Sequence, residues 1–242
     1  MNTTPFRHSS FIARHYLVAL LLTTLAGCGL SQRPPERAFF AIDPGHPATV
    51  ATTTAPSTAP ATSIAPSDLT LRVLAARVAK PYDSQSFVYK LAPNQFQSDY
   101  YNGFIAPPDR MLAGALIEWL NHSGAVKYAV GSASSLDTRY SLELTVPALY
   151  ADYTNPKSPK AIIEIRAFLF HEGSSGTQIL LQNLYQESEP IEAPPAGASS
   201  GGVVNGSAAA ANNTPANIAA AYSRAYQKIL TRLTDDLQKL TP

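Results

Sequence analysis

Residues 140–146 read YSLELTV, a stretch that alternates strictly between apolar and polar side chains. One face carries Tyr140, Leu142, Leu144 and Val146, and the other carries Ser141, Glu143 and Thr145. A period of two is typical of a strand that packs one face on a core and exposes the other to solvent. Residues 161–169 repeat the pattern, and 177–185 follow after the turn at 173–176, which predicts an antiparallel hairpin.

Two other segments have helical periodicity. The first begins at Pro107-Pro108-Asp109 and ends at Gly124, with apolar residues at 112, 115, 116, 119 and 120. The second begins at about Pro215. Its apolar positions are Ile218, Tyr222, Ala225, Ile229, Leu233 and Leu237. Such a stripe is typical of a helix that covers a sheet.

Short strands are expected before and between these helices. Their ranges are 38–42, 69–80 as one strand, 86–91, 96–101 and 126–130. Runs of strands interrupted by two helices predict an α+β fold with a single domain over residues 38–242. We expect one mixed or largely antiparallel sheet with both amphipathic helices on one face. Residues 48–67 and 193–214, rich in Ala, Ser, Thr and Pro or Gly, are expected to be low-complexity loops.

The first 27 residues have the three-part pattern of a secretory signal. Arg7 and Arg14 precede a short apolar run at 16–25, which is too short for a lasting membrane span. Small residues then lead to Cys28, the only cysteine of the chain.

Residues 25–28, Leu-Ala-Gly-Cys, resemble the bacterial lipobox at all four positions. This resemblance implies cleavage before Cys28 and acylation of that residue, so that residues 28–37 form a lipidated tether. Gly29 stands where an aspartate would retain a lipoprotein at the inner membrane, which favours the periplasmic face of the outer membrane. The alternative is an ordinary signal peptide followed by a free cysteine.

Composition and motifs argue against several classes of function. The net charge of +1 gives no electrostatic footprint for nucleic acid. The sequence contains no Walker loop, HExxH, GxSxG or CxxC motif. His46, His122 and His171 lie in separate contexts, and the pair Asp235-Asp236 is expected on a solvated helix face. We therefore expect no enzyme activity, no metal site and no cofactor.

Seven aromatic residues are concentrated between positions 82 and 104. One interpretation is strand packing, since aromatic side chains favour half-buried pleated surfaces. The other is an exposed patch for a partner or for lipid. For that patch the candidate residues are Tyr82, Phe87, Tyr89, Tyr100, Tyr101 and Phe104. Tyr100 and Tyr101 should face opposite ways unless a β-bulge intervenes.

Several segments occur in an order that resembles a known family. They are Phe39–Ile42, Leu69–Val78 with Pro81-Tyr82 and Phe87–Lys90, Tyr101–Leu112, Leu181–Pro190 and Ile218–Leu237. Behind a lipobox, this order resembles the auxiliary lipoproteins of ABC-type transport systems, whose paraquat-inducible type works with MCE proteins in moving lipid between membranes. The chain departs from the family at Phe104, where a Trp-Ala pair is usual, and in its long segment 193–214.

The resemblance implies a non-enzymatic accessory subunit, anchored to the membrane in the periplasm. It would dock to an MCE-type or substrate-binding component of the transporter, and a homo-oligomer is left open. The alternative function is a stand-alone lipoprotein that assembles or chaperones outer-membrane components. A periplasmic hydrolase is a third reading, which the motif search argues against.

Overall fold

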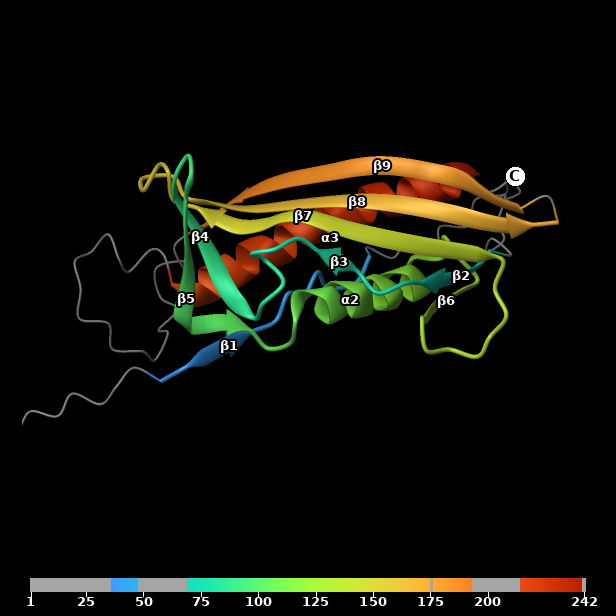
Figure 1. The fold of residues 1–242 in the computed structure, drawn as a ribbon, viewed down its shortest axis with the longest axis horizontal. Coiled ribbons are helices and arrows are strands. Elements are labelled where there is room, and N and C mark those ends of the chain that lie inside the picture. Colours follow the sequence, from blue (N-terminus) through green and yellow to red (C-terminus); the bar gives the residue numbers. More distant parts are fainter. Residues whose placement is uncertain (1–35, 48–68, 175, 193–213, 241–242) are drawn as a thin grey trace, which may run out of the picture. The chain divides into compact units, whose positions relative to one another are not determined.

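The computed structural model describes residues 36–47, 69–174, 176–192 and 214–240 (Figure 1). The expected signal peptide 1–27, Cys28, most of the tether and nearly all of the two low-complexity segments lie outside the described residues. From Arg37 onward the described chain belongs to one compact unit with a mixed sheet and two helices. The predicted α+β fold with a single domain is therefore confirmed.

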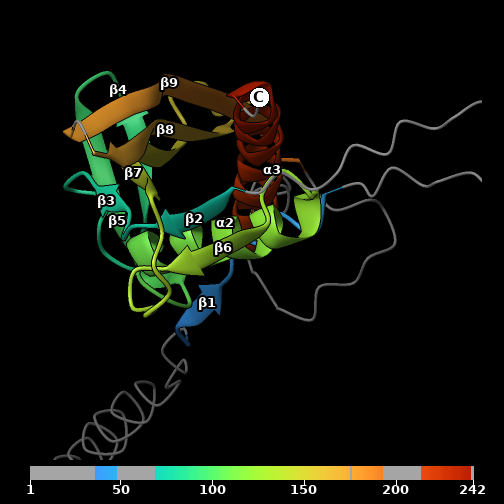
Figure 2. The same ribbon diagram turned by 90° about the vertical axis from the view of Figure 1, so that its right-hand side faces the viewer.

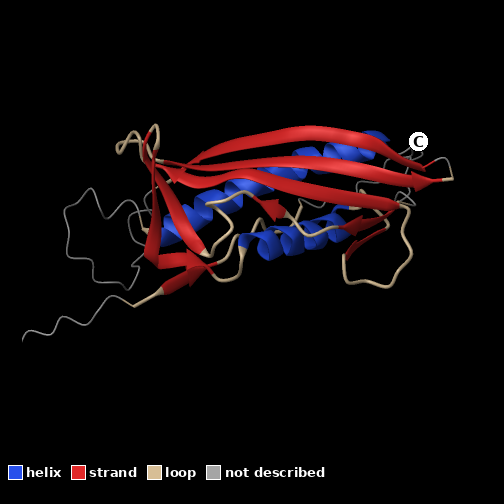
Figure 3. Cartoon of the chain, in the orientation of Figure 1, coloured by secondary structure: helices blue, strands red, loops and turns tan. Residues whose placement is uncertain are grey.

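The alternating segment that begins at Tyr140 forms the strand on which the sheet is built. This strand, β7 (Tyr140–Asp152), pairs antiparallel with β8 (Lys160–Gly173), which pairs antiparallel with β9 (Gly176–Pro190). Along its other side β7 pairs in turn with three short parallel strands. They are β2 (Thr70–Val73), β3 (Arg77–Val78) and β4 (Ser86–Ala92). Figure 3 shows β7 and β8 as long strands that run the length of the sheet.

The remaining strands extend the sheet from β4 and from β2. Strand β5 (Gln95–Phe104) forms an antiparallel hairpin with β4, and β1 (Ala38–Phe40) pairs parallel with β5. Strand β6 (Tyr128–Gly131) pairs parallel with β2. The order along this path is β1-β5-β4-β7-β2-β6, so β1 and β6 lie at opposite ends of it.

Helices α2 (Pro108–Ser123) and α3 (Pro215–Leu240) occupy the inner face of the curved sheet (Figure 2). Helix α2 has proline in its first turn and ends at Gly124, whose φ of 70° is the left-handed conformation that glycine tolerates best. All six apolar positions expected on the α3 stripe are buried. Residues of both helices and of the inner strand faces form one hydrophobic core.

Two strand boundaries differ from the sequence expectation. The predicted strand 69–80 is divided into β2 and β3, each of which pairs with a different part of β7. Strand β7 continues past Val146 to Asp152. Pro147 does not end the strand, because it lies exposed at a register shift between Thr145 and Ala148. A proline, which has no N–H to donate, is tolerated at such a bulge.

Charged residues join α3 to the outer strand β9. Glu189, which is only 6% exposed, pairs with Lys228 and Arg224 of the helix. Arg232 of the helix pairs with Glu187 at 2.6 Å. Buried carboxylates need such partners because an unpaired charge is costly to desolvate.

Asp235 is exposed, as predicted for a solvated helix face, whereas Asp236 is only partly exposed and has hydrogen-bond partners that the sequence did not predict. The Asp236 carboxylate accepts hydrogen bonds from Asn183 at 3.1 Å and from the Tyr185 hydroxyl at 2.9 Å. The sequence pattern missed this role because the partners lie about 50 residues away on β9. Asp236 therefore helps to hold α3 on the sheet.

Two tyrosines one turn apart on α3 provide a matched test of the packing. The Tyr226 hydroxyl donates to the Leu112 carbonyl of α2 at 2.7 Å, whereas the buried Tyr222 hydroxyl has no partner among the described residues. Tyr226→Phe should lower the free energy of unfolding by about 1 kcal/mol, and Tyr222→Phe should leave it unchanged or raise it.

Thermal unfolding checks this pair, since about 1 kcal/mol shifts the melting temperature of a domain of this size by roughly 2–4 °C. The substitution is the same in both variants, so each serves as the control for the other. Equal losses of melting temperature would contradict the assigned hydrogen bonding.

Candidate functional site

The β4–β5 hairpin contains a large bulge. Val88 pairs with Ser98 and Ser86 pairs with Gly103, so the four residues Asp99–Asn102 of β5 lie opposite the single residue Phe87. A bulge of this size leaves backbone groups without ladder partners. The Asp99 side chain supplies the missing acceptor.

Four hydrogen bonds converge on the Asp99 carboxylate. Its Oδ1 accepts from the backbone N–H groups of Tyr101 at 2.8 Å and Asn102 at 3.0 Å. Its Oδ2 accepts from the Tyr89 hydroxyl at 2.5 Å and from the Asn102 amide at 2.9 Å. The carboxylate thus closes the bulge and attaches it to β4.

The protonation states of Asp99 and Tyr89 are consistent with the hydrogen bond between them. Burial by itself would raise the pKa of Asp99, but the hydrogen bonds to its charged form hold the pKa below its usual value. Burial, together with the bond to Asp99, raises the pKa of the Tyr89 hydroxyl. At neutral pH an ionised acceptor therefore faces a protonated donor.

The bulge brings Tyr100 and Tyr101 to the surface together. Tyr100 is 69% exposed and Tyr101 is 41% exposed. Their rings meet edge to face with centroids 5.0 Å apart. The expectation that these neighbours face opposite ways does not apply here, because the bulge interrupts the alternation of the strand.

Strand β1 lies beside this bulge, with Phe39 in register with Gly103. The Arg37 Nε donates to the Tyr100 carbonyl at 3.1 Å, and the guanidinium carbon lies 4.8 Å from the centre of the Tyr100 ring. We refer to Arg37, Phe39, Tyr100 and Tyr101 as the Arg37 patch.

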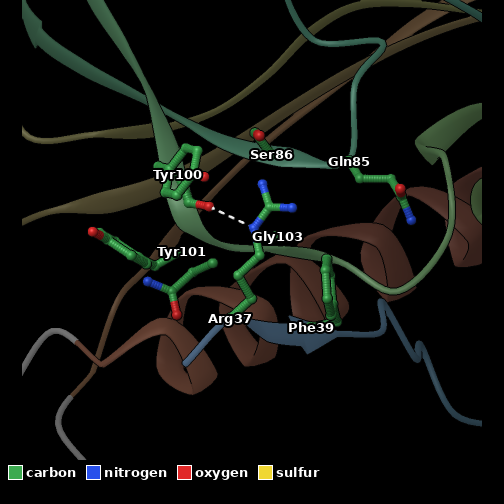
Figure 4. Close-up of a pocket in the computed structure, with 8 residues that line it drawn as sticks. Arg37, Phe39, Gln85, Ser86, Tyr100, Tyr101 and Gly103 are labelled. Atoms are coloured by element: carbon green, nitrogen blue, oxygen red, sulfur yellow. Dashed lines mark hydrogen bonds between the residues drawn. The ribbon is translucent and has the colours of Figure 1, made fainter. Parts of the chain in front are cut away.

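The Arg37 patch surrounds a pocket of about 230 Å³. Its other lining residues are Gln85, Ser86, Asn102 and Gly103. Figure 4 shows the Arg37 guanidinium in the middle of the pocket, with Tyr100 and Tyr101 on one side and Phe39 and Gln85 on the other. The pocket therefore presents a cation framed by aromatic rings and neutral polar groups.

Gly103 allows the close backbone approach that shapes this pocket. A Cβ atom at position 103 would lie 2.3 Å from the Gln85 carbonyl oxygen, and that oxygen also accepts from the Phe104 N–H at 2.6 Å. Because the obstructing atom belongs to the backbone, a larger residue could be accommodated only by moving β5 away from Gln85.

The other aromatic candidates are distributed differently. Phe87 and Phe104 are buried, and their ring centroids lie 4.8 Å apart. Both rings therefore pack in the core, and we exclude them from the candidate partner-binding residues. Tyr89 is half-buried, because its hydroxyl donates to Asp99 and its ring packs against the ring of Tyr153. Tyr82 is half-exposed and belongs to a second group of rings.

That second group consists of Tyr82, Phe96 and Tyr150, which we call the hairpin patch. Ring centroids are 5.9 Å apart for Tyr82 and Tyr150 and 5.6 Å apart for Phe96 and Tyr150. The Lys90 ammonium lies 5.5 Å from the centre of the Tyr150 ring. Phe96 is 41% exposed and the other two rings are partly exposed, so the group forms a partly exposed aromatic surface shared by β5, β7 and the segment before β4.

The histidines are placed differently from the sequence expectation. The rings of His46 and His122 have centroids 4.7 Å apart, because the segment after β1 returns to the end of α2. His171 instead packs against Tyr140.

Among the described residues, no group of three His, Cys, Asp or Glu side chains is arranged to hold a metal ion. Within the same ranges, neither helix has the length and apolar character needed to cross a membrane.

Comparison with known proteins identifies the fold. No family model and no curated protein matches the sequence. The structure is similar to protein XCC0632 from Xanthomonas campestris, described as a DUF330 protein, with a TM-score of 0.53 and 21% identity over 70% of this chain and 85% of that one. It is also similar to an uncharacterized protein, with a TM-score of 0.50 and 14% identity over 70% and 92% of the two chains.

A further solved structure, the hypothetical protein CT253 from Chlamydia trachomatis, has a TM-score of 0.42 and 9% identity over 71% of this chain and 98% of that chain. At the identities of the first two matches, the similarity establishes a shared fold. The chain therefore has the fold of a DUF330 protein.

Two glycines test whether the close approach at Gly103 shapes the site. Gly103→Ala should lower the free energy of unfolding by about 1–3 kcal/mol, because the added methyl group collides with backbone. The matched control is Gly114→Ala in α2, where a Cβ meets nothing within 4 Å. That variant should gain about 0.5–1 kcal/mol. Denaturant unfolding distinguishes the two signs, and a Gly103→Ala chain as stable as the unsubstituted protein would contradict the assignment.

Proposed function

We propose that the protein is a non-enzymatic, membrane-anchored accessory subunit of an ABC-type, MCE-linked lipid transport system. The observation that carries the proposal is a DUF330-like fold directly behind the lipobox at residues 25–28. The family-like segments also follow one another in the fold as β1, β2 to β4, the passage from β5 into α2, and β9 followed by α3. The absence of nucleotide and hydrolase motifs from the sequence agrees with an accessory role.

Acylation of Cys28 would supply the membrane attachment. A single acyl chain binds a bilayer only marginally, while each buried methylene adds about 0.8 kcal/mol, so several chains on one cysteine hold a protein durably. The folded unit begins at Arg37, nine residues later. The proposed location is the periplasmic face of the outer membrane.

The hairpin patch is the surface that we assign to the transporter component. Exposed aromatic rings are the side chains that contribute most to binding at protein interfaces. The rings of Tyr82, Phe96 and Tyr150 already contact one another, so little side-chain freedom would be lost on docking. The partner is an MCE-type or substrate-binding protein.

Copurification tests this proposal. The full chain with a C-terminal tag, extracted in detergent from its native membranes, should recover an MCE or permease component. Phe96→Ser should reduce that recovery about tenfold, equivalent to about 1.4 kcal/mol of binding free energy, because it removes an exposed ring of the hairpin patch. Cys28→Ala should release the protein from the membrane fraction.

The matched control is Tyr128→Ser, which removes a 56% exposed aromatic ring from β6 at the other end of the sheet. It should leave recovery unchanged. Recovery of outer-membrane assembly proteins without any transporter component would instead favour the stand-alone assembly role and contradict the proposal.

A further inference from the structure

The covalent distance between Cys28 and the folded unit limits where that unit can lie. Arg37 is the ninth residue after Cys28, with eight residues between them. A fully extended chain covers at most about 3.3–3.6 Å per residue, so the two residues are at most roughly 30 Å apart. Arg37 is itself part of the patch described above. Arg37 is the first residue of the folded unit, so the Arg37 patch contains the residue that follows the N-terminal segment directly in the sequence.

The cation of the patch is arranged to receive an anion. The Arg37 Nε is used by the Tyr100 carbonyl, while its Nη atoms have no hydrogen-bond partner among the described residues. The Tyr100 ring supports the guanidinium from one side. The described lining residues of the pocket include no carboxylate. A guanidinium that is held by a ring, and whose Nη donors have no partner in the described part of the chain, is suited to a phosphate group.

The rim of the patch has the composition of a membrane interface. Phe39 is 51% exposed, and Ile105, whose N–H donates to the Phe40 carbonyl of β1, is 64% exposed. Tyr100 and Tyr101 add rings with polar tips. Tyrosine at the headgroup level and arginine with its charge among the phosphates are the usual arrangement at bilayer surfaces.

We propose that the Arg37 patch binds the surface of a phospholipid bilayer, with the Arg37 guanidinium on a lipid phosphate and the rings of Phe39, Tyr100 and Tyr101 among the headgroups. The inference rests on the proposed function, because acylated Cys28 places the bilayer within reach. Tethering raises the effective concentration of the bilayer to the millimolar range or above, so a weak contact is sufficient. The contact sets the orientation of the domain on the membrane.

The single thiol of the chain allows a direct test. The mature chain from residue 28 is coupled through Cys28 to a maleimide-bearing lipid in vesicles of phosphatidylcholine and phosphatidylglycerol. A benzoylphenylalanine photo-crosslinker replaces Tyr100 in one sample and Tyr128, an exposed tyrosine on β6, in the other. Position 100 should yield at least about tenfold more lipid adduct than position 128.

A second comparison addresses the phosphate contact. Arg37→Gln should reduce the lipid adduct at position 100 severalfold, whereas Arg110→Gln, which changes an exposed arginine of α2, should not. Equal adduct yields at positions 100 and 128, or adducts with a second copy of the chain in place of lipid, would overturn the proposal.

Chemical coupling replaces acylation in these vesicles, and no transporter component is present. The outcome is therefore independent of the copurification result. Failure of lipid crosslinking would overturn the bilayer contact alone, while failure to recover a transporter component would overturn the accessory role alone.

Discussion

The Arg37 patch, which we propose as the bilayer-binding surface, depends on one carboxylate. Asp99 accepts four hydrogen bonds within a bulge of β5, and without it the N–H groups of Tyr101 and Asn102 and the half-buried Tyr89 hydroxyl would lose their acceptor. Each of these hydrogen bonds to a charged acceptor contributes about 1.5–3 kcal/mol, so their joint loss should weaken the bulge. With Asp99 in place, both tyrosines emerge on the same surface beside β1, and Arg37 is held against one of them.

The sequence was sufficient to predict those parts of the fold that follow from periodicity. The alternation from Tyr140, the hairpin across residues 173–176, and the stripes on both helices all have the predicted structure. Periodicity does not determine which strands pair, so the parallel pairing of β2, β3 and β4 along β7 was not predicted. The role of Asp236 was missed for the same reason, because its partners come from a distant strand.

The candidate site was predictable only in part. The concentration of aromatic residues drew attention to the hairpin that contributes to both patches, but alternation could not separate buried Phe87 and Phe104 from exposed Tyr100. One local signal was present, since Asp99 and Asn102 flank the Tyr100-Tyr101 pair, and such residues bond their own backbone at turns and bulges. The position of Arg37 over Tyr100 required β1 to pair with β5, a contact across about 60 residues.

Two surfaces of different composition include residues of the β4–β5 hairpin. The hairpin patch is aromatic with one lysine beside it, whereas the Arg37 patch surrounds a pocket with an arginine whose Nη donors have no partner in the described part of the chain. A lipid-anchored accessory subunit has to meet a bilayer and a protein at once, and two separate surfaces allow both contacts together. The arrangement supports the proposed role because the patch that contains Arg37, the first residue of the folded unit, has the chemistry suited to headgroups.

Amide hydrogen exchange at the bulge tests the central claim most directly, since it reports on individual backbone donors. The N–H groups of Tyr101 and Asn102 should exchange slowly although their residues lie at the surface, because both donate to the Asp99 carboxylate. In Asp99→Ala both amides should lose this protection while amides of β7 keep theirs. Rapid exchange of both amides in the unsubstituted protein would contradict the account, since the bulge would then not hold the Arg37 patch in the arrangement described.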